Sequence, residues 1–307
     1  MKILITPRSF GKHNEEHFKM LEAKGLSIVR NETGGIMTED DMKAAIAGAV
    51  GVIIGVDPLN ADVLARAPGL KAVAKYGVGT DNIDLDYCKE NDIKVSITTG
   101  ANSEAVADYT FALILALARK VVEIDCHCHE KDWTKITTSD VYGKTVGLVG
   151  LGSIGKGVAK RAQGFGMEVL AYRRNWDDEY GRSAGVKYAT VDEICERSDF
   201  ISLHTPLTEE TKNIIGKREL GLMKPGAFIV NTARGGLIDE DALLTALEEG
   251  RVAGAGLDAF AHEPPEDDRW YALKNVIMGS HCGASTRGAA ESMSFMSAQN
   301  LINDLGL

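Results

Sequence analysis

Short apolar runs alternate with amphipathic segments along most of the chain. In the first hundred residues the apolar runs lie at 2–6, 26–29, 51–55, 71–75 and 93–97. Segments with helical periodicity lie between them, at about 13–24, 39–47 and 60–67. A second series of apolar runs lies at 145–150, 167–172, 199–203, 226–231, 253–257 and 275–280. Such alternation is typical of parallel sheets covered by helices on both faces, so the pattern predicts an α/β protein with two doubly wound parallel sheets.

The segment from Asn102 to Arg119 has the pattern of a long helix, with Asn102 or Ser103 as its N-cap. Its second half, from Phe111 to Ala118, is apolar nearly all round. A helix of this kind must be buried on more than one side. We therefore expect it at a domain junction or at a subunit interface.

The composition is that of a globular protein with room for two domains. The chain has 307 residues, of which 44% are hydrophobic and 25% are charged. Its formal net charge of −10 argues against nucleic acid or an anionic membrane as the main partner. No apolar run approaches the length of a membrane span, and the N-terminal strand is too short for a signal peptide. We expect the protein in the cytoplasm.

Five cysteines are scattered along the chain, at positions 88, 126, 128, 195 and 282. An odd number in a chain of this character favours free thiols over a disulfide framework. Cys126, His127, Cys128 and His129 are consecutive metal-ligand types, but consecutive side chains on a helix point around its axis. No second cluster completes a tetrahedral site, so we expect a helix end here and no metal.

A glycine motif follows the apolar run at 145–150. Beyond the motif, the segment from Lys156 to Gly166 is compatible with a helix, and the next apolar run starts at 167. In such a strand–loop–helix–strand context, glycines let the backbone N–H groups at the helix start hold a pyrophosphate. The motif therefore predicts a dinucleotide site. Its binding residues are Gly150, Gly152, Ser153, Ile154 and Gly155.

The residues after the run at 167–172 bear on the choice of dinucleotide. An enzyme that uses NAD places an acid here to accept both ribose hydroxyls, whereas this chain has Arg173 and Arg174. An arginine pairs with the 2′-phosphate of NADP and stacks on the adenine. We therefore expect NADP to be preferred. NAD is the alternative, because arginines at a strand end are also compatible with simple solvent exposure.

Two candidate reactive side chains stand at the carboxyl ends of later strands. Arg234 follows the run at 226–231, and His281 closes the run at 275–280. A guanidinium fork can hold a carboxylate and reach a carbonyl oxygen, and an imidazolium can protonate the alkoxide formed from that carbonyl. With a dinucleotide as hydride carrier, these parts predict the dehydrogenation of an alcohol on an anionic substrate.

Further motifs follow one another along the chain. They are Lys75–Asp84, Gly100–Asp108, Gly150–Gly155, His204–Thr208, Asn231–Gly235, Gly256–Phe260, Glu263–Pro264 and His281–Gly283. In this set the chain resembles the D-isomer-specific 2-hydroxyacid dehydrogenases, a family that includes phosphoglycerate dehydrogenase, glyoxylate/hydroxypyruvate reductase and D-lactate dehydrogenase. The resemblance covers essentially the whole chain.

The resemblance implies a Rossmann cofactor domain inserted into a flavodoxin-like substrate domain. The substrate domain would comprise residues 1–100 and 285–307, and the nicotinamide-dinucleotide-binding domain residues 101–284. The active site would lie in the cleft. The chain would form a homodimer through its cofactor domain.

The resemblance also implies roles for the candidate residues. His281 would be the acid/base, Glu263 would hydrogen-bond its ring and favour the protonated form, and Arg234 would bind the substrate carboxylate and carbonyl. Cofactor contacts would come from Arg173, Arg174, His204, Thr205, Pro206, Thr211, Thr232, Ala233, Asp258, His281 and Gly283. Substrate contacts would come from Lys75, Tyr76, Gly77, Val78, Gly79 and Asn102, with the glycine turn supplying backbone N–H groups. Trp270 and Tyr271 are candidates for a wall of the pocket.

The sequence leaves the substrate and two other functions open. The expected reaction is hydride transfer between NAD(P)H and a small 2-oxo acid or D-2-hydroxy acid. One alternative is a phosphoglycerate dehydrogenase-type activity without a regulatory domain. Others are a nucleotide-sensing corepressor-like protein, which would carry extensions for its partners, and a homocysteine-forming hydrolase, which would need a far longer chain.

Overall fold

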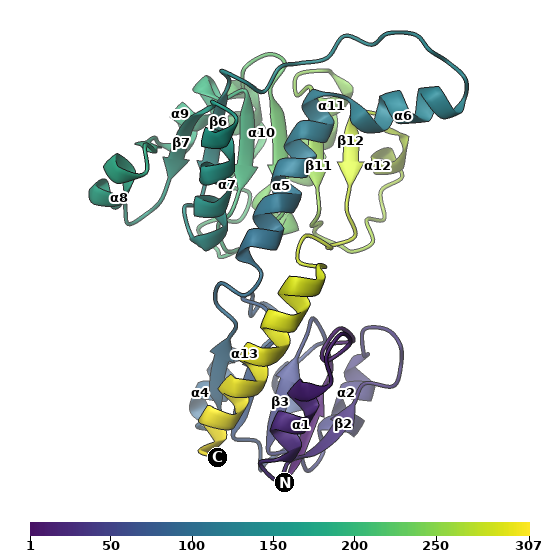
Figure 1. Cartoon of the computed structure of the whole chain (residues 1–307), viewed down its shortest axis with the longest axis vertical. Coiled ribbons are helices and arrows are strands. Elements are labelled where there is room, and N and C mark those ends of the chain that lie inside the picture. The colour runs from purple at the N-terminus through teal and green to yellow at the C-terminus, as the bar shows by residue number, and fades with distance from the viewer. The chain divides into compact units, whose positions relative to one another are not determined.

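The computed structural model describes all 307 residues. The chain divides into two compact units (Figure 1). One unit combines Met1–Asn102 with Ser285–Leu307, and the other is the continuous segment Ser103–Ala284. Each unit is built on its own parallel sheet. No helix in either unit combines the length and the apolar character needed to cross a membrane.

The first unit has a five-stranded parallel sheet with the order β2-β1-β3-β4-β5. Its strands are β1 (Lys2–Ile5), β2 (Ser27–Arg30), β3 (Gly51–Ile54), β4 (Ala72–Lys75) and β5 (Lys94–Ile97). Strands β3 and β4 are buried along their whole length, as a parallel sheet covered on both faces requires. The order is that of the flavodoxin-like fold, which confirms the predicted fold class for this unit.

Helices on both faces complete the core of the first unit. They are α1 (Glu16–Glu22), α2 (Glu39–Ile46), α3 (Ala61–Leu64), α4 (Leu85–Glu90) and α13 (Arg287–Leu305). Helices α2, α3 and α4 share one apolar cluster with the sheet, and α1 and α13 share another. The C-terminal helix α13 packs against β3, β4 and β5. The first unit therefore needs the end of the chain to cover one face of its sheet.

The second unit has a seven-stranded parallel sheet with the order β12-β11-β10-β9-β6-β7-β8. Its strands are β6 (Thr145–Val149), β7 (Glu168–Tyr172), β8 (Lys187–Tyr188), β9 (Phe200–Leu203), β10 (Phe228–Asn231), β11 (Gly254–Leu257) and β12 (Val276–Met278). The strand order reverses at β6, which has β7 on one side and β9 on the other. This is the Rossmann order, in which ligands bind outside the carboxyl ends of the strands at the reversal.

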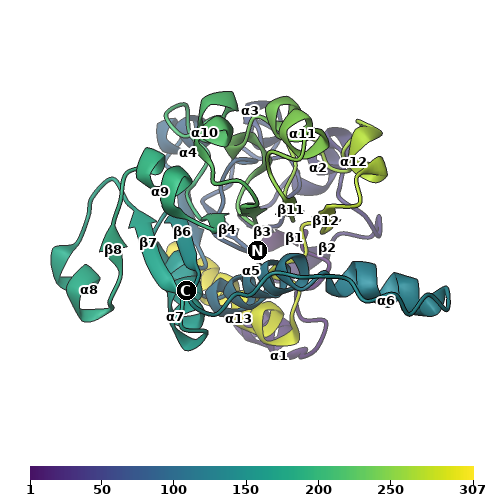
Figure 2. The ribbon, with the colours of Figure 1, turned by 90° about the horizontal axis from the view of Figure 1, so that it is seen from above.

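Two helical layers cover this sheet (Figure 2). Helices α5 (Ser103–Ala118) and α7 (Ser153–Gly164) pack together on one face. On the other face lie α9 (Val191–Arg197), α10 (Lys217–Leu222) and α11 (Glu240–Glu248). The unit also contains α6 (Val121–His129), α8 (Asp178–Ser183), α12 (Arg269–Ala272) and the 3-10 turn η1 (Gly235–Leu237). Helix α6 extends away from the sheet and buries none of its residues.

Helix α5 is less enclosed within its unit than its sequence suggests. Its buried positions contact α7 and the strands β10 and β11. On the other side, however, Ala112 is exposed, and Leu115 and Ala116 are only partly buried. One apolar side of α5 therefore stays partly open.

The structure corrects several predicted boundaries. Helix α7 begins at Ser153 rather than at Lys156, because the last part of the glycine motif forms its first turn. Strand β12 ends at Met278, so His281 lies in the following loop rather than at the strand end. The helix predicted at 13–24 is shorter. The prediction named no element at α4, at β8 or at any of the helices α8 to α13. Most of these elements are too short to produce a clear apolar period.

Candidate functional site

The glycine motif forms a tight loop between β6 and α7. Gly150 has a left-handed backbone with φ of 109°, and its N–H group donates to the carbonyl of Tyr172 at 2.9 Å. A Cβ atom at Gly150 would lie 2.5 Å from the carbonyl of His204. A Cβ atom at Gly155 would overlap the carbonyl oxygen of Gly150. Only glycine therefore fits at both positions.

Gly152 differs, because its surroundings are open. It is the N-cap residue of α7, it offers no side chain to the first turn, and a Cβ atom would meet nothing within 4 Å. The N–H groups of the first turn, which includes Ser153 and Ile154, therefore lack a side-chain cap. A pyrophosphate fits this open space, where it would meet these N–H groups and the positive end of the helix.

The two arginines after β7 have different surroundings. Arg174 forms an ion pair with Glu210 at 2.6 Å, and both side chains are exposed. Arg173 is partly buried and makes no hydrogen bond or ion pair within the chain. Arg173 directly follows Tyr172, whose carbonyl accepts from the glycine loop. Its guanidinium is thus available for an anionic group of a dinucleotide.

The loop after β9 is held by its own side chains. The ring Nε2 of His204 lies 2.9 Å from the hydroxyl of Ser202, and burial lowers the pKa of His204 well below its ordinary value. The hydroxyl of Thr211 donates to the carbonyl of Pro206 at 2.7 Å. Because His204 and Thr205 abut the glycine motif, this loop borders the candidate dinucleotide site.

Arg234 lies in a turn after β10 that is fixed by Asn231. The buried side chain of Asn231 accepts from the N–H of Ala233 at 3.0 Å and donates to the carbonyl of Arg234 at 2.7 Å. The Arg234 side chain donates to the carbonyl of Ala233 at 2.7 Å. The hydroxyl of Thr232 lies 2.8 Å from that of Thr110 in α5. The turn therefore has a fixed position at the carboxyl edge of the sheet.

Close backbone packing brings this turn beside the segment that carries Glu263. A Cβ atom at Gly235 would overlap the backbone of Phe260 and Ala261. The positive charge of Arg234 accordingly favours the ionised form of Glu263. Two of the three predicted catalytic residues thus lie in one neighbourhood.

Glu263 and His281 form a direct pair. The two carboxylate oxygens lie 2.9 and 3.0 Å from Nδ1 of His281. Burial acts to raise the pKa of Glu263, but the hydrogen bond and charge of His281, the N–H of Phe260 and the charge of Arg234 together hold it below its usual range. The side chains of His281 and Glu263 are 41% and 39% exposed. The contact at Nδ1 leaves Nε2 of the ring for a reactant.

Asp258 follows β11 and holds the loop after His281. Its buried carboxylate accepts from the N–H of Cys282 at 2.9 Å and from the N–H of Gly283 at 2.7 Å. A Cβ atom at Gly283 would lie 3.0 Å from this carboxylate. Asp258 and Gly283, both expected to contact the cofactor, are therefore in direct contact with each other.

In the first unit, Lys75 and Tyr76 make contacts within the fold. Lys75 is buried, and its ammonium donates to the carbonyl of Gly55 and, at 2.7 Å, to the side chain of Asn82. The Tyr76 hydroxyl donates to the carbonyl of Ala290 at 3.0 Å. These groups therefore fix the end of β4 and its contact with α13.

The glycine turn after β4 offers fewer N–H groups than predicted. Gly77 has φ of 131°, and its N–H donates to the hydroxyl of Thr98 at 2.9 Å. The N–H groups of Val78 and Gly79 make no hydrogen bond within the chain. Val78 and Gly79 are therefore left as donors for an anion, and Gly77 shapes the turn.

Asn102 precedes α5, where the sequence suggested either a helix cap or a ligand contact. Its side-chain oxygen Oδ1 is buried and has no hydrogen-bond partner in the structure. Capping therefore does not account for this side chain. Because buried polar atoms normally have a partner, Asn102 stays a candidate for a ligand contact.

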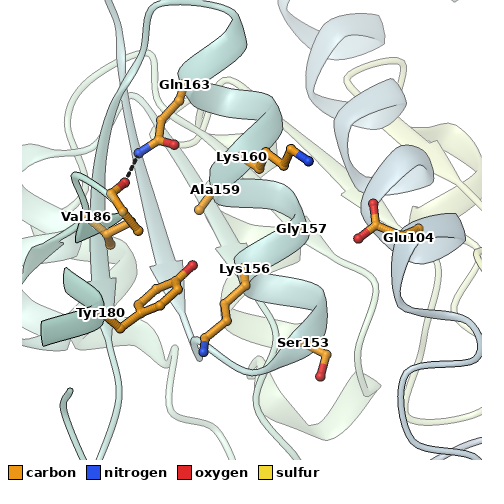
Figure 3. A pocket seen from close by; sticks show the side chains of 10 residues that line it. Glu104, Ser153, Lys156, Gly157, Ala159, Lys160, Gln163, Tyr180 and Val186 are labelled. Atoms are coloured by element: carbon orange, nitrogen blue, oxygen red, sulfur yellow. Dashed lines mark hydrogen bonds between the residues drawn. The ribbon is translucent and has the colours of Figure 1, made fainter. Parts of the chain in front are cut away.

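A hollow of about 390 Å³ lies along α7 (Figure 3). Residues from α5, α7, α8 and the segment between α8 and β8 line it. Within it, the ammonium of Lys156 lies 3.9 Å from the centre of the Tyr180 ring. Of the predicted site residues, only Ser153 lines this hollow. It is therefore separate from the candidate catalytic residues.

The two aromatic candidates for a wall of the pocket differ in burial. Trp270 is buried in the core against Phe260, with ring centroids 5.6 Å apart, so it does not line an open pocket. Tyr271 is exposed, and its hydroxyl donates to the carbonyl of Pro265 at 2.9 Å. Tyr271 therefore stays a candidate.

The consecutive cysteines and histidines lie at the end of α6, as predicted. Cys126 and Cys128 are exposed free thiols, and the other three cysteines are free as well. No three side chains of metal-ligand type converge anywhere in the structure.

Comparison with known proteins places these features in a family. The sequence-family model described as D-isomer specific 2-hydroxyacid dehydrogenase, NAD binding domain, matches residues 111–283. A glyoxylate reductase from Thermococcus litoralis is 43% identical over 260 residues, which cover 82% of this chain and 78% of that protein. A D-3-phosphoglycerate dehydrogenase from Methanocaldococcus jannaschii is 39% identical over 305 residues, which cover 98% of this chain and 57% of that protein.

The chain is also similar to solved structures, both in fold and in sequence. The crystal structure of the TT0316 protein from Thermus thermophilus matches with a TM-score of 0.90 and 37% identity. The match covers 100% of this chain and 97% of that one. The predicted resemblance is confirmed by these findings. The chain belongs to the D-isomer specific 2-hydroxyacid dehydrogenases, a family of oxidoreductases with a nicotinamide-dinucleotide-binding domain.

Proposed function

We propose that the chain reduces a small 2-oxo acid to the D-2-hydroxy acid with a nicotinamide cofactor. We assign the cofactor to residues 101–284 and the substrate-binding role to residues 1–100 and 285–307. The family relation and the open space at Gly152 support the cofactor assignment. The hydrogen bond between His281 and Glu263 supports proton transfer in the same unit.

The proposed mechanism assigns one task to each member of the triad. When bound, the nicotinamide supplies hydride to the carbonyl carbon of the substrate. His281 donates a proton from Nε2 to the carbonyl oxygen, while Glu263 holds the opposite nitrogen and stabilises the protonated ring. Arg234 binds the substrate carboxylate and polarises the carbonyl with its guanidinium. In the reverse direction the neutral ring of His281 takes up the hydroxyl proton.

We assign further substrate contacts to the first unit. The N–H groups of Val78 and Gly79 are donors without a partner in the chain, and they suit a carboxylate. Asn102 has a buried acceptor without a donor, and the hydroxyl of a 2-hydroxy acid is such a donor. Lys75 and Tyr76 would act on the substrate indirectly, by holding the strand end before the turn.

We infer that NADP(H) is preferred over NAD(H). Arg173 carries a positive charge with no carboxylate partner in the chain, next to the residue that bonds the glycine loop. The 2′-phosphate is the one group that distinguishes the two coenzymes, and a guanidinium pairs with it well. Arg174 is a weaker candidate, because Glu210 already pairs with it. The remaining cofactor contacts named above stay predictions.

We also propose a homodimer that forms through the second unit. Helix α6 buries none of its residues, and its apolar residues Val121 and Val122 are exposed. Trp133, in the next loop, is exposed as well. The partly open side of α5 adds apolar surface. Light scattering during gel filtration tests this proposal.

The free cysteines support a reducing compartment, and we place the protein in the cytoplasm.

The contact between Glu263 and His281 Nδ1 carries the proposed function, because it makes the ring an oriented proton donor. The test is a screen of glyoxylate, hydroxypyruvate and pyruvate with NADPH and with NADH. Turnover is measured as the loss of absorbance of the reduced nicotinamide. We expect turnover with at least one of these acids. Coenzyme binding without any turnover would favour a nucleotide-sensing protein instead.

A second candidate is phosphoglycerate dehydrogenase-type activity. The similarity to the Methanocaldococcus jannaschii protein over 98% of this chain favours it. The same assay with 3-phosphohydroxypyruvate separates the two candidates. A preference for the phosphorylated acid over hydroxypyruvate would select this alternative.

A further inference from the structure

The carboxylate of Asp258 faces the loop that carries His281. Asp258 directly follows β11, and only 2% of the residue is exposed. Its Oδ1 and Oδ2 accept from the N–H groups of Cys282 and Gly283, the two residues after His281. Hydrogen bonds to a charged group are about twice as strong as neutral ones. Two of them on consecutive residues therefore fix this part of the loop firmly.

The loop is fixed on the other side of His281 as well. The N–H of Gly279 donates to the carbonyl of the last residue of β11 at 2.7 Å. Between these anchors, His281 has φ of 56°, in the left-handed region that residues with a side chain rarely occupy. Such a conformation persists only where the surrounding structure imposes it. Asp258 supplies two of the three anchors.

Tyr109 of α5 completes the surroundings of this carboxylate. A Cβ atom at Gly279 would overlap Oδ1 of Asp258 and lie 2.6 Å from the Tyr109 hydroxyl. Because Gly279 has no side chain, the Asp258 carboxylate and the Tyr109 hydroxyl can both approach the loop. Burial, a hydrogen bond with the Cys282 side chain and the charge of Asp258 raise the pKa of Tyr109, so its hydroxyl stays protonated.

We propose that Asp258 is a positioning residue for His281. Through the N–H groups of Cys282 and Gly283 it sets the backbone of His281 and thereby aims the ring that Glu263 holds. This inference rests on the proposed role of His281 as the proton donor. It is a task besides the cofactor contact implied by the family resemblance, because each carboxylate oxygen keeps a lone pair for another donor.

Asp258→Asn tests this role while keeping the shape of the side chain. The amide can accept from one of the two N–H groups but presents its own N–H to the other. The loop should then relax, and a ring displaced by about 1 Å costs about a hundredfold in rate. We expect kcat for 2-oxo acid reduction to fall about tenfold to a hundredfold. The Kd of oxamate, an unreactive analogue, should not change, because no substrate contact is assigned to Asp258.

Gly279→Ala perturbs the same contact without removing the carboxylate. Its methyl group would displace Asp258 and Tyr109, so kcat should fall as in Asp258→Asn. Asp239→Ala is the matched control for lost stability. Asp239 caps α11 by accepting from the N–H of Ala242 at 3.1 Å, so this variant should lower Tm and leave kcat unchanged.

The nitrogen NMR spectrum of the histidine rings gives a readout without turnover. The His281 signal reports the hydrogen bond to Glu263, and Asp258→Asn and Gly279→Ala should change it while Asp239→Ala should not. A raised Kd for NADPH with normal kcat in Asp258→Asn would overturn the inference in favour of a cofactor contact alone. A lowered Tm with normal kcat and an unchanged ring signal would show a purely structural role.

The proposed function fails separately, if the wild-type protein reduces no 2-oxo acid. In that case the ring signal still decides the inference. A changed His281 signal in Asp258→Asn supports positioning by Asp258, and an unchanged signal rejects it.

Discussion

Replacement of Glu263 by glutamine tests its coupling to His281. Under the proposed mechanism reduction requires the protonated ring of His281. The Glu263 carboxylate holds this ring at Nδ1 and stabilises its charge. Glu263→Gln keeps the size of the side chain and an oxygen acceptor but removes the charge. The kcat for reduction should therefore fall.

The geometry of the pair sets the size of this effect. Both carboxylate oxygens lie within hydrogen-bond distance of Nδ1, but the two side chains are 41% and 39% exposed, so water screens their charges. Exposed ion pairs contribute about 0.2–1 kcal/mol, and hydrogen bonds to charged groups about 1.5–3 kcal/mol. A half-exposed pair lies between these ranges, on the order of 1–1.5 kcal/mol, which corresponds to about a tenfold fall in kcat.

The assay is steady-state kcat for reduction with saturating 2-oxo acid and coenzyme at neutral pH. Glu240→Gln is the matched control, because Glu240 accepts from the N–H of Ala261 at 2.7 Å and makes no hydrogen bond to His281. In the oxidation direction, which needs the neutral ring, Glu263→Gln should lower kcat less than it does in reduction. An unchanged kcat for reduction in Glu263→Gln would refute the assigned partnership.

Substitutions at the proton donor, at the arginine after β7 and in the glycine motif have distinct expected outcomes. His281→Ala should lower kcat for reduction by a factor on the order of 10²–10⁴ with little effect on NADPH binding in a fluorescence titration, and near-normal turnover would remove His281 as the donor. Arg173→Asp should raise KM for NADPH about tenfold to a hundredfold, since a hydrogen bond of ~1.5–3 kcal/mol is lost, and leave NADH kinetics unchanged or improved. Equal losses with both coenzymes would contradict that role. Gly155→Ala should lower Tm, because its methyl group overlaps a backbone oxygen, whereas Gly152→Ala should keep Tm and weaken NADPH binding. Unchanged NADPH binding in Gly152→Ala would argue against the open space as the pyrophosphate site.

Most strands can be predicted from the sequence, because buried parallel strands require continuous apolar runs. The ends of elements are harder to predict, because they depend on local backbone contacts. Ser153 starts α7 although the glycines around it disfavour a helix. The left-handed backbone of His281 depends on Asp258, which is 23 positions earlier in the chain and across the end of the sheet. No local pattern of residues encodes such a contact.

The candidate site can likewise be predicted from the sequence only in part. The types and order of Arg234, Glu263 and His281 are visible in the sequence, whereas the direct contact of Glu263 with Nδ1 depends on the tertiary structure. The hydroxyl of Thr98 accepts a hydrogen bond from the N–H of Gly77, and the sequence of the turn alone does not predict this contact. Trp270 shows the opposite error, because an aromatic residue between two site motifs is buried in the core.

The path of the chain has a consequence for synthesis on the ribosome. The sheet of the first unit is complete by Ile97, but α13, which covers one of its faces, begins only at Arg287. At about 5–20 residues per second, the intervening segment takes on the order of 10–40 s to make. During this time the apolar face formed by Ile53, Ala72 and Ala74 lacks the helix that covers it, while the uninterrupted second unit can fold as it emerges. The nascent first unit is therefore the part of this protein most in need of a chaperone.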